Sequence, residues 1–506
     1  MKKINIILTT FVLIFSGCTE FLTLEPQDEL IREEYWKTET DVENVIGQAY
    51  AKLAYILDEI YLWSELRGGL LSPSERNVKP ATLEFYNFNV NEYNELTKWG
   101  DFYIVINLAN TIIEYASSAK ENDKTFTELA YNGYIAEAYY LRSMCYFYLV
   151  KSFKEVPFIT KSYSMDDQDF DFEKSSEQEI IDQLITDLNS IIDKAFKVDY
   201  YIDVEDPRRK GRVNVNTVHA LLAEIHLWNN DYQSCIASCN KISDLFYPLV
   251  DGENYFDIFG NGGNESESIF ELQFNYEEYR TTNEYKLDHD DPDKNLYSLT
   301  SNHSRGDRES VVSERLIELF SLDDLRQYDP REGNVTYNSI SSSIWKYEGN
   351  EPYNAEDEYH NDRNFYFSDA NWIFYRFPDI ILMKAEAYAE LKDYTKSLEQ
   401  LNIVRKRAGI DDYNNTNENS LIAEILNERA REFVGEGKRY FDLVRICRRD
   451  INKRLPVISE SVVSNVDSKS RSAVATRIND INSWFLPIFY NELLLNKKLT
   501  QNAFYE

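Results

Sequence analysis

Two stretches of the chain repeat one pattern of small, apolar and polar positions. Ala223-Glu224-Ile225-His226-Leu227 leads to Asp231-Tyr232, and Ala385-Glu386-Ala387-Tyr388-Ala389 leads to Asp393-Tyr394 at the same spacing. A third copy begins at Ala136-Glu137-Ala138-Tyr139 but lacks the Asp-Tyr end. Each unit predicts an amphipathic helix, a polar turn and a second helix.

The helices predicted for the first two units cover 215–228 with 233–242, and 379–391 with 394–407. Small alanines let paired helices approach closely while leucine and tyrosine fill the gaps, as in tetratricopeptide hairpins. Further helices are predicted at 40–63, 99–119, 130–153, 177–197 and 420–447. The predicted fold class is therefore mainly α, a tetratricopeptide-like helical-hairpin scaffold with long irregular loop insertions.

The insertions differ from the scaffold in composition. Segments at about 66–98, 246–310 and 328–375 are rich in Asn, Asp, Gly, Ser and Tyr, contain several Trp, and show little helical period. Loops of that length are commonly functional surfaces or disordered, and the aromatic content argues against disorder. We expect one domain from 18 to 506, with its helical scaffold and its loop-rich insertions divided as follows: scaffold at about 40–65, 99–245 and 376–447, insertions at about 66–98, 246–375 and 448–485.

The N-terminal segment has the layout of a secretory signal peptide. Met1-Lys2-Lys3 forms a basic head, and the mostly apolar run from 4 to 15 spans 12 residues, well short of the roughly 20 that cross a bilayer as a helix. Phe15-Ser16-Gly17-Cys18 resembles the lipobox of bacterial lipoproteins, although Phe15 stands where Leu is usual. We expect residues 1–17 to be removed and Cys18 to be acylated, with an ordinary cleaved leader as the alternative.

Composition and charge narrow the classes of partner. The 506 residues contain 54 Lys plus Arg against 87 Asp plus Glu, a formal net charge of −33. Such a surface repels phosphate backbones, so a nucleic acid partner is not expected. Aromatic residues make up 14% of the chain, and their flat faces with polar handles suit both a packed core and a binding surface.

The remaining cysteines, histidines and acidic residues are predicted to have structural roles and not to bind metal ions. Cys235 and Cys239 lie four apart on a predicted helix with no second ligand pair nearby, and His219 and His226 lie seven apart, so buried side chains are favoured over a zinc site. The acidic segment 288–293 offers oxygen ligands for calcium but lacks the spacing of an EF-hand, and a solvated turn is favoured. No cofactor or metal is predicted.

The C-terminal third carries a family signature. Residues 426–445 read Leu-Asn-Glu-Arg-Ala-Arg-Glu-Phe-Val-Gly-Glu-Gly-Lys-Arg-Tyr-Phe-Asp-Leu-Val-Arg and resemble the helix pair typical of the SusD/RagB family of outer-membrane lipoproteins from Bacteroidetes. Ordered matches to this family continue through most of the chain after Cys18, at 103–110, 138–157, 376–387, 401–409 and 486–502. The closing residues 501–505 lack the Pro-Gly often found there.

The charges of this signature have a structural explanation of their own. They alternate at three- and four-residue steps on both sides of a Gly435 to Gly437 turn, so opposite charges meet along a helix and across the turn. An ion-pair network is favoured over catalysis because arginines keep neighbouring carboxylates ionised. The residues concerned are Glu428, Arg429, Glu432, Glu436, Arg439, Asp442 and Arg445.

The resemblance implies a function without catalysis. SusD-like proteins are lipid-anchored on the outer membrane, exposed at the cell surface, and sit on a SusC-like, TonB-dependent barrel to which they deliver oligosaccharides or polysaccharides. Peptides replace glycans in RagB-like relatives, which makes a peptide ligand the nearest alternative. A glycoside hydrolase would need two carboxylates roughly 5–10 Å apart, and a helical scaffold that binds only protein is a third possibility.

Ligand contacts are expected in the insertions, since aromatic faces and polar side chains together bind sugars. Each candidate also has an ordinary explanation as a packing residue. The candidates are Trp63, Arg67, Arg76 and Tyr86 near the first insertion, and Trp345, Tyr347 and Trp372 in the later ones.

Overall fold

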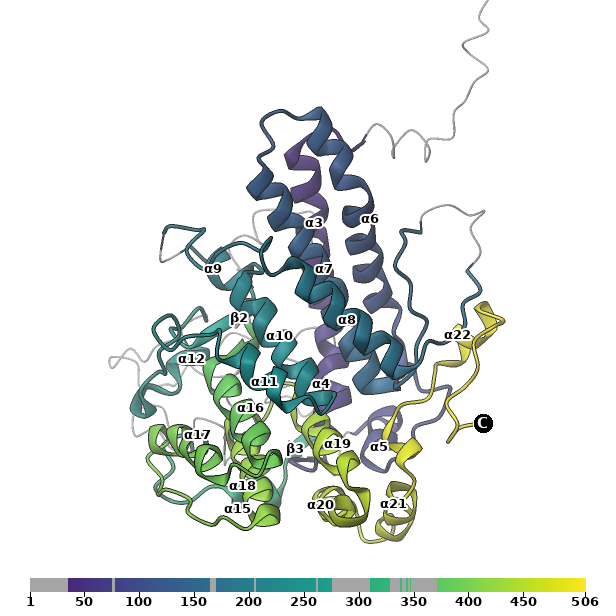
Figure 1. The fold of residues 1–506 in the computed structure, drawn as a ribbon. Helices are drawn as coiled ribbons and strands as arrows, with labels where there is room; N and C mark the ends of the chain where they lie inside the picture. The colour runs from purple at the N-terminus through teal and green to yellow at the C-terminus, as the bar shows by residue number, and fades with distance from the viewer. Residues whose placement is uncertain are drawn as a thin grey trace, which may run out of the picture.

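The computed structural model is mainly helical (Figure 1). It describes residues 35–74, 78–163, 170–203, 206–260, 263–274, 310–327, 337–338, 343–344, 346 and 371–506. The predicted fold class is confirmed. None of the described helices combines the length and apolar character needed to cross a membrane.

Five helices form the N-terminal part of the scaffold. They are α3 (Glu39–Leu53), α4 (Leu57–Glu65), α6 (Gly100–Asn122), α7 (Glu128–Phe153) and α8 (Glu177–Ile191). Figure 1 shows α3, α6 and α7 running side by side. Helix α7 is apolar on nearly every side because α3, α6, α8 and α10 all pack against it.

The two repeated sequence units form the predicted helical hairpins. Helices α10 (Val215–Trp228) and α11 (Tyr232–Cys239) make the first, and α16 (Phe377–Glu390) and α17 (Tyr394–Arg407) make the second. The repeated aspartate caps each second helix: Asp231 accepts from the Ser234 N–H (3.1 Å) and Asp393 from the Lys396 N–H (3.3 Å). Helix α11 packs against α16, which joins the two hairpins.

Strands brace the ends of the long insertion. Strand β2 (Ser268–Leu272) pairs antiparallel with β6 (Trp372–Arg376), so the segments before and after the insertion lie side by side. Shorter pairs join β1 (Leu71–Pro73) to β3 (Ser310–Val312) and β4 (Tyr337–Asn338) to β5 (Ser343–Ile344). Short helices within or beside the insertions are α5 (Pro80–Tyr86), α9 (Arg208–Gly211), α12 (Asp257–Gly260) and α15 (Glu314–Leu319).

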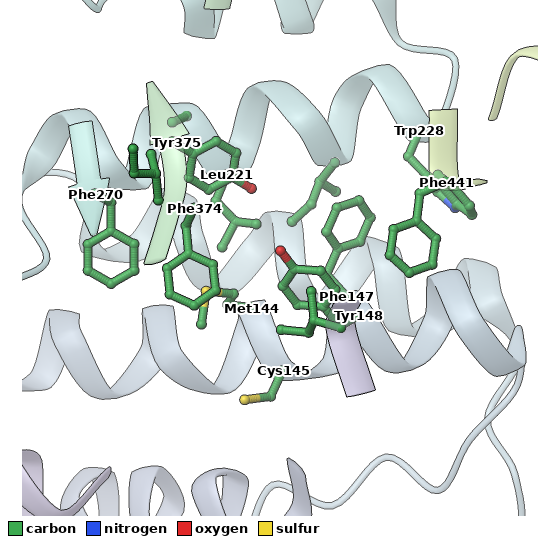
Figure 2. Close-up of a cluster of buried hydrophobic side chains, with 14 of the residues drawn as sticks. Met144, Cys145, Phe147, Tyr148, Leu221, Trp228, Phe270, Phe374, Tyr375 and Phe441 are labelled. Carbon is green, nitrogen blue, oxygen red and sulfur yellow. The ribbon is translucent and has the colours of Figure 1, made fainter. Parts of the chain in front are cut away.

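Aromatic side chains fill the space between α7, α10 and the β2–β6 pair (Figure 2). Phe147 packs edge-on against Trp228 with ring centroids 6.0 Å apart, and Phe270 stacks on Phe374 at 5.3 Å. Such pairs add about 0.5–1.5 kcal/mol to the free energy gained from burying the rings. A large part of the 14% aromatic content therefore belongs to the core.

The C-terminal region contains more helix than predicted. After α18 (Glu418–Phe433) and α19 (Arg439–Arg449) come α20 (Ile451–Val463), α21 (Arg471–Ile478) and the short α22 (Tyr490–Leu495). The prediction of a loop-rich segment at 448–485 was wrong. Pro456 lies inside α20, and the helix buries only a narrow set of side chains, including Arg454 and Ile458, so its apolar period is weak in the sequence.

Candidate functional site

The charged signature forms a buried ion-pair network, as predicted. Arg376 at the end of β6 bonds to Glu436 (2.9 Å), to Glu432 and to Glu267 (2.9 Å). Arg326 bonds to Glu428 (2.7 Å) and Glu432 (2.8 Å), and all of these side chains are fully buried. The network therefore ties α18 to segments more than 50 residues earlier in the chain.

A second group of ion pairs ties α18 and α19 to α16 of the second repeat unit. Arg429 bonds to Asp379 (2.7 Å) and to Asp442 (2.8 Å), and Arg445 bonds to Glu386 (2.6 Å). Asp379 and Glu386 were not assigned to the network from the sequence, although their helical spacing places them on one face of α16, two turns apart.

These carboxylates are held in their ionised form. Burial opposes ionisation of Glu432, yet Arg407, Arg376 and Arg326 keep its pKa well below the usual value. Burial likewise opposes ionisation of Glu386, but Arg445 and Arg449 lower its pKa to about 2. A carboxylate so stabilised is a poor proton donor near neutral pH, so the geometry favours a structural role for the signature.

Arg439 departs from the prediction. Its guanidinium donates to the carbonyl oxygens of Leu426 (3.0 Å) and Gly68 (3.3 Å) and makes no ion pair with a described carboxylate. Burial lowers its pKa to about 10. A neighbouring acid, Glu65 at the end of α4, instead accepts the backbone N–H groups of Gly437 (3.0 Å) and Lys438 (3.3 Å) at the turn.

Two of the predicted ligand-binding tryptophans are core residues, which corrects their assignment as surface contacts. Trp63 and Trp372 both have 0% of their surface exposed. Trp63 stacks on Phe102 with centroids 5.2 Å apart and donates to the Leu96 carbonyl oxygen (2.7 Å). Trp372 packs against Gly437, where a Cβ atom would lie 3.0 Å from the indole. Neither ring offers a face to a ligand from solution in this structure.

Arg67 and Tyr86 are also buried, at 2% and 4% exposure. The Arg67 guanidinium lies over the Tyr440 ring, 4.1 Å from its centroid, and donates to the Trp484 carbonyl oxygen (3.0 Å). The Tyr86 hydroxyl donates to Ser310 Oγ (2.8 Å). Arg67 thus joins the first insertion to the C-terminal region, and Tyr86 joins it to β3, so this part of the assignment is corrected as well.

The other predicted residues lie outside the described part of the chain. They are Cys18, Arg76, Trp345, Tyr347 and the acidic segment 288–293.

The histidines and cysteines lie where packing residues are expected. His219 and His226 are each 8% exposed on α10, and burial lowers the pKa of both imidazoles. Cys235 and Cys239 are buried free thiols. Among the described residues, no three His, Cys, Asp or Glu side chains gather in a way that would hold a metal ion.

The described part of the first insertion does expose one ring to solvent, and no pattern in the sequence distinguishes it from the buried rings nearby. Tyr93 is 63% exposed and packs against Tyr490 of α22, with ring centroids 4.9 Å apart and the planes at 40°. A hydrogen bond to Glu92 raises the pKa of the Tyr93 hydroxyl. The pair combines apolar ring faces with charged and hydrogen-bonding neighbours, which is the chemistry that binds sugars.

A second ring surface lies between α8 and α9. Tyr200, 37% exposed, stacks on the buried Phe196 with centroids 4.2 Å apart and meets Tyr201 nearly at right angles. The Arg208 guanidinium covers the Tyr201 ring at 4.6 Å. This surface also presents aromatic faces beside polar groups.

A pocket of about 630 Å³ lies between the two repeat hairpins. Ile242, Ile380 and Ile381 contribute to its apolar lining, and Lys384 is one of its charged residues. Leu245 and Phe246 follow the lining residue Asp244 in the chain and are 87% and 56% exposed. Exposed apolar side chains beside a concave surface are typical of a protein contact.

Comparison with protein families matches both ends of the chain. Residues 332–505 match the model described as SusD family, and residues 20–196 match the model described as starch-binding associating with outer membrane. A SusD-like protein of Formosa agariphila is 25% identical with 100% of both chains covered. A SusD-like protein of Bacteroides ovatus is 22% identical over 54% of this chain and 50% of that protein.

Solved structures share the fold. A SusD superfamily protein of Bacteroides thetaiotaomicron aligns with a TM-score of 0.72 at 20% identity, covering 93% of this chain and 99% of the other. Surface glycan-binding protein A of Bacteroides uniformis aligns with a TM-score of 0.70 at 21% identity, covering 93% and 100%.

Proposed function

This chain belongs to the SusD-like family, and from that premise we propose that it is a surface lipoprotein that binds oligosaccharides or polysaccharides and delivers them to a SusC-like, TonB-dependent transporter. It acts by binding, without altering its ligand. The family match carries the proposal, and the exposed tyrosine surfaces supply chemistry suited to sugars.

The similarity to known glycan-binding proteins supports a glycan as the ligand. One matching family is described as starch-binding and associating with the outer membrane, and one structural neighbour is named a surface glycan-binding protein. In this chain, Tyr93 and Tyr200 are exposed rings next to charged side chains. A protein built to hold sugars presents this combination, because a pyranose offers apolar C–H faces and hydroxyl groups together.

Affinity electrophoresis against a panel of polysaccharides tests this function. We expect retarded migration on at least one polymer, without release of reducing sugar from it. Reducing-sugar release would instead support a glycoside hydrolase. Binding of peptides with no retardation on any polysaccharide would support the RagB-like alternative.

The membrane anchor is proposed to be the acylated Cys18. Acyl chains can hold a protein at a membrane without any spanning helix, and two or more anchoring signals are needed for stable attachment. Cys18→Ala should move the protein from the membrane fraction to the soluble fraction and abolish incorporation of radiolabelled palmitate. Palmitate incorporation that persists in the variant would contradict the assignment.

Delivery to a transporter requires a protein-binding surface. The exposed Leu245 and Phe246 beside the pocket between the repeat hairpins suit that role. Leu245→Glu with Phe246→Glu should reduce co-purification with the outer-membrane barrel while leaving polysaccharide retention unchanged. Leu322→Glu, at a side chain 96% exposed elsewhere on the surface, is the matched control.

A further inference from the structure

Tyr93 is the most exposed of the aromatic side chains in the described part of the chain. The loop that carries it is nevertheless held at several points. The Tyr93 N–H donates to Asn91 Oδ1 (3.0 Å), and the Asn91 amide donates in turn to Glu84 (3.0 Å). The Tyr490 N–H donates to the Glu92 carbonyl oxygen (2.7 Å) and joins the loop to α22. The ring is therefore presented in a fixed position, at a low cost in conformational entropy when a ligand binds.

The two tyrosine rings form an open angle. Their planes meet at 40° with centroids 4.9 Å apart, so the rings do not cover one another as a parallel stack would. Leu494 lies four residues after Tyr490 on α22, hence on the same side of the helix, and is 57% exposed. Tyr93, Tyr490 and Leu494 thus offer adjoining apolar faces, while α22 itself has no buried residue.

Charged side chains border this surface. Glu95 and Lys98 form an ion pair (3.2 Å) whose side chains are 76% and 48% exposed, and Glu92 bonds to the Tyr93 hydroxyl. These side chains supply hydrogen-bond acceptors and donors for the hydroxyl groups of a sugar. Two acids against one lysine, on a chain of net charge −33, make the surroundings unfavourable for sulfated or uronic polymers.

We propose that Tyr93 and Tyr490 form a stacking subsite for a neutral sugar ring, with Glu92, Glu95 and Lys98 contacting its hydroxyl groups. This inference rests on the proposed function, because it names the place and the class of glycan. The rings bind the apolar C–H face of the sugar, and the charged side chains fix its orientation. Polyanionic glycans are rejected by Glu92 and Glu95.

The experiment compares ring removal with ring retention. Tyr93→Ala and Tyr490→Ala should each weaken retention by a neutral polysaccharide by about 10-fold, and Tyr93→Phe should stay within about 2-fold of the wild type, since the ring face and not the hydroxyl makes the contact. Tyr55→Ala, which removes a ring that is 38% exposed between α3 and α4, is the matched control and should bind as the wild type does. The panel contains neutral glucans, xylan and mannan together with alginate and a sulfated galactan.

The possible results separate the two proposals. Wild-type retention that survives Tyr93→Ala and Tyr490→Ala, or that is lost only in Tyr55→Ala, overturns the subsite and leaves the proposed function standing. Retention by the anionic polymers alone overturns the neutral class of ligand. A wild-type protein that no polysaccharide retards overturns the proposed function, and the subsite with it. Melting curves of all variants show that the folded protein is compared throughout.

Discussion

The α18–α19 hairpin and the Tyr93–Tyr490 surface lie at opposite extremes of burial. Every residue from Glu428 to Cys447 is buried, although the segment is dense in charge. Helix α22, by contrast, has no buried residue and exposes Leu494 and Leu495. Charge in the sequence is therefore no guide to exposure here, because each buried charge has a partner that makes its burial tolerable.

The largest expected loss of stability comes from removing the Arg376 side chain from the buried ion-pair network. Arg376→Ala leaves Glu267, Glu432 and Glu436 short of their shared cation, so we expect the free energy of unfolding to fall by about 5 kcal/mol. Urea denaturation measures the change. Lys396→Ala removes an exposed pair with Asp393 and should leave the free energy of unfolding nearly unchanged, because water screens an exposed ion pair. Equal effects for the two variants would contradict a structural role for the network.

Trp63→Ala tests whether a predicted ligand contact is a core residue. Removing a fully buried indole that stacks on Phe102 should cost about 3–5 kcal/mol. The melting temperature should drop accordingly, and any loss of glycan retention should follow the loss of folded protein. Weakened retention with an unchanged melting curve would restore Trp63 as a ligand contact.

Glu65→Gln should change how stability depends on pH. Burial raises the pKa of Glu65 from 4.5 to about 7, against the opposing effect of backbone N–H groups at the turn. Between those pH values the folded protein keeps a proton that the unfolded chain releases, so the free energy of unfolding falls as pH rises through this window. The glutamine keeps an acceptor oxygen and cannot ionise. Relative to the wild type, the variant should therefore gain on the order of 3 kcal/mol between pH 4 and pH 8.

Urea denaturation across this pH range provides the measurement. The change with pH is the informative quantity, because the buried amide of glutamine adds a constant offset of its own. Parallel pH profiles for the two proteins would show that Glu65 does not titrate in this range in the folded state.

A matched pair of glycine substitutions compares a packed helix face with an open one. A Cβ at Gly133 in α7 would lie 2.1 Å from the Phe196 ring, whereas one at Gly47 in α3 would meet nothing within 4 Å. Gly133→Ala should cost about 1–3 kcal/mol by overpacking, while Gly47→Ala should stabilise by up to about 1 kcal/mol through helix propensity. Thermal denaturation distinguishes the signs. Stabilisation by both variants would mean that Phe196 gives way easily.

The smallest effect on stability is expected from a substitution in the exposed Tyr93–Tyr490 surface. Tyr93→Ala removes a ring that is 63% exposed and should leave the free energy of unfolding nearly unchanged. Its melting curve should match that of the wild type within error. A large loss of stability would show that Tyr93 holds the loop to α22, and the binding comparison would then need Tyr93→Phe as its reference.

The sequence by itself determined the local elements and the family. The repeated Asp-Tyr positions mark helix starts because an aspartate side chain caps the backbone N–H groups of the turn that follows, which is a local interaction. The alternating charges of 428–445 likewise predicted an ion-pair network, since opposite charges three and four residues apart meet on a helix. The spacing of apolar residues did not predict helix α20, because Pro456 and a narrow buried face obscure the helical period there.

Only the tertiary structure decided which side chains are buried and which long-range partners they meet. Trp63 and Tyr93 belong to neighbouring segments of the chain, yet the Trp63 ring is buried against Phe102 and the Tyr93 ring is exposed to solvent. Arg376 pairs with Glu432, and Tyr93 packs against Tyr490, which is nearly 400 residues away in the chain. Both contacts form only when the whole chain folds. Burial and distant pairing depend on how helices and strands pack together, and no spacing within a single element contains that information.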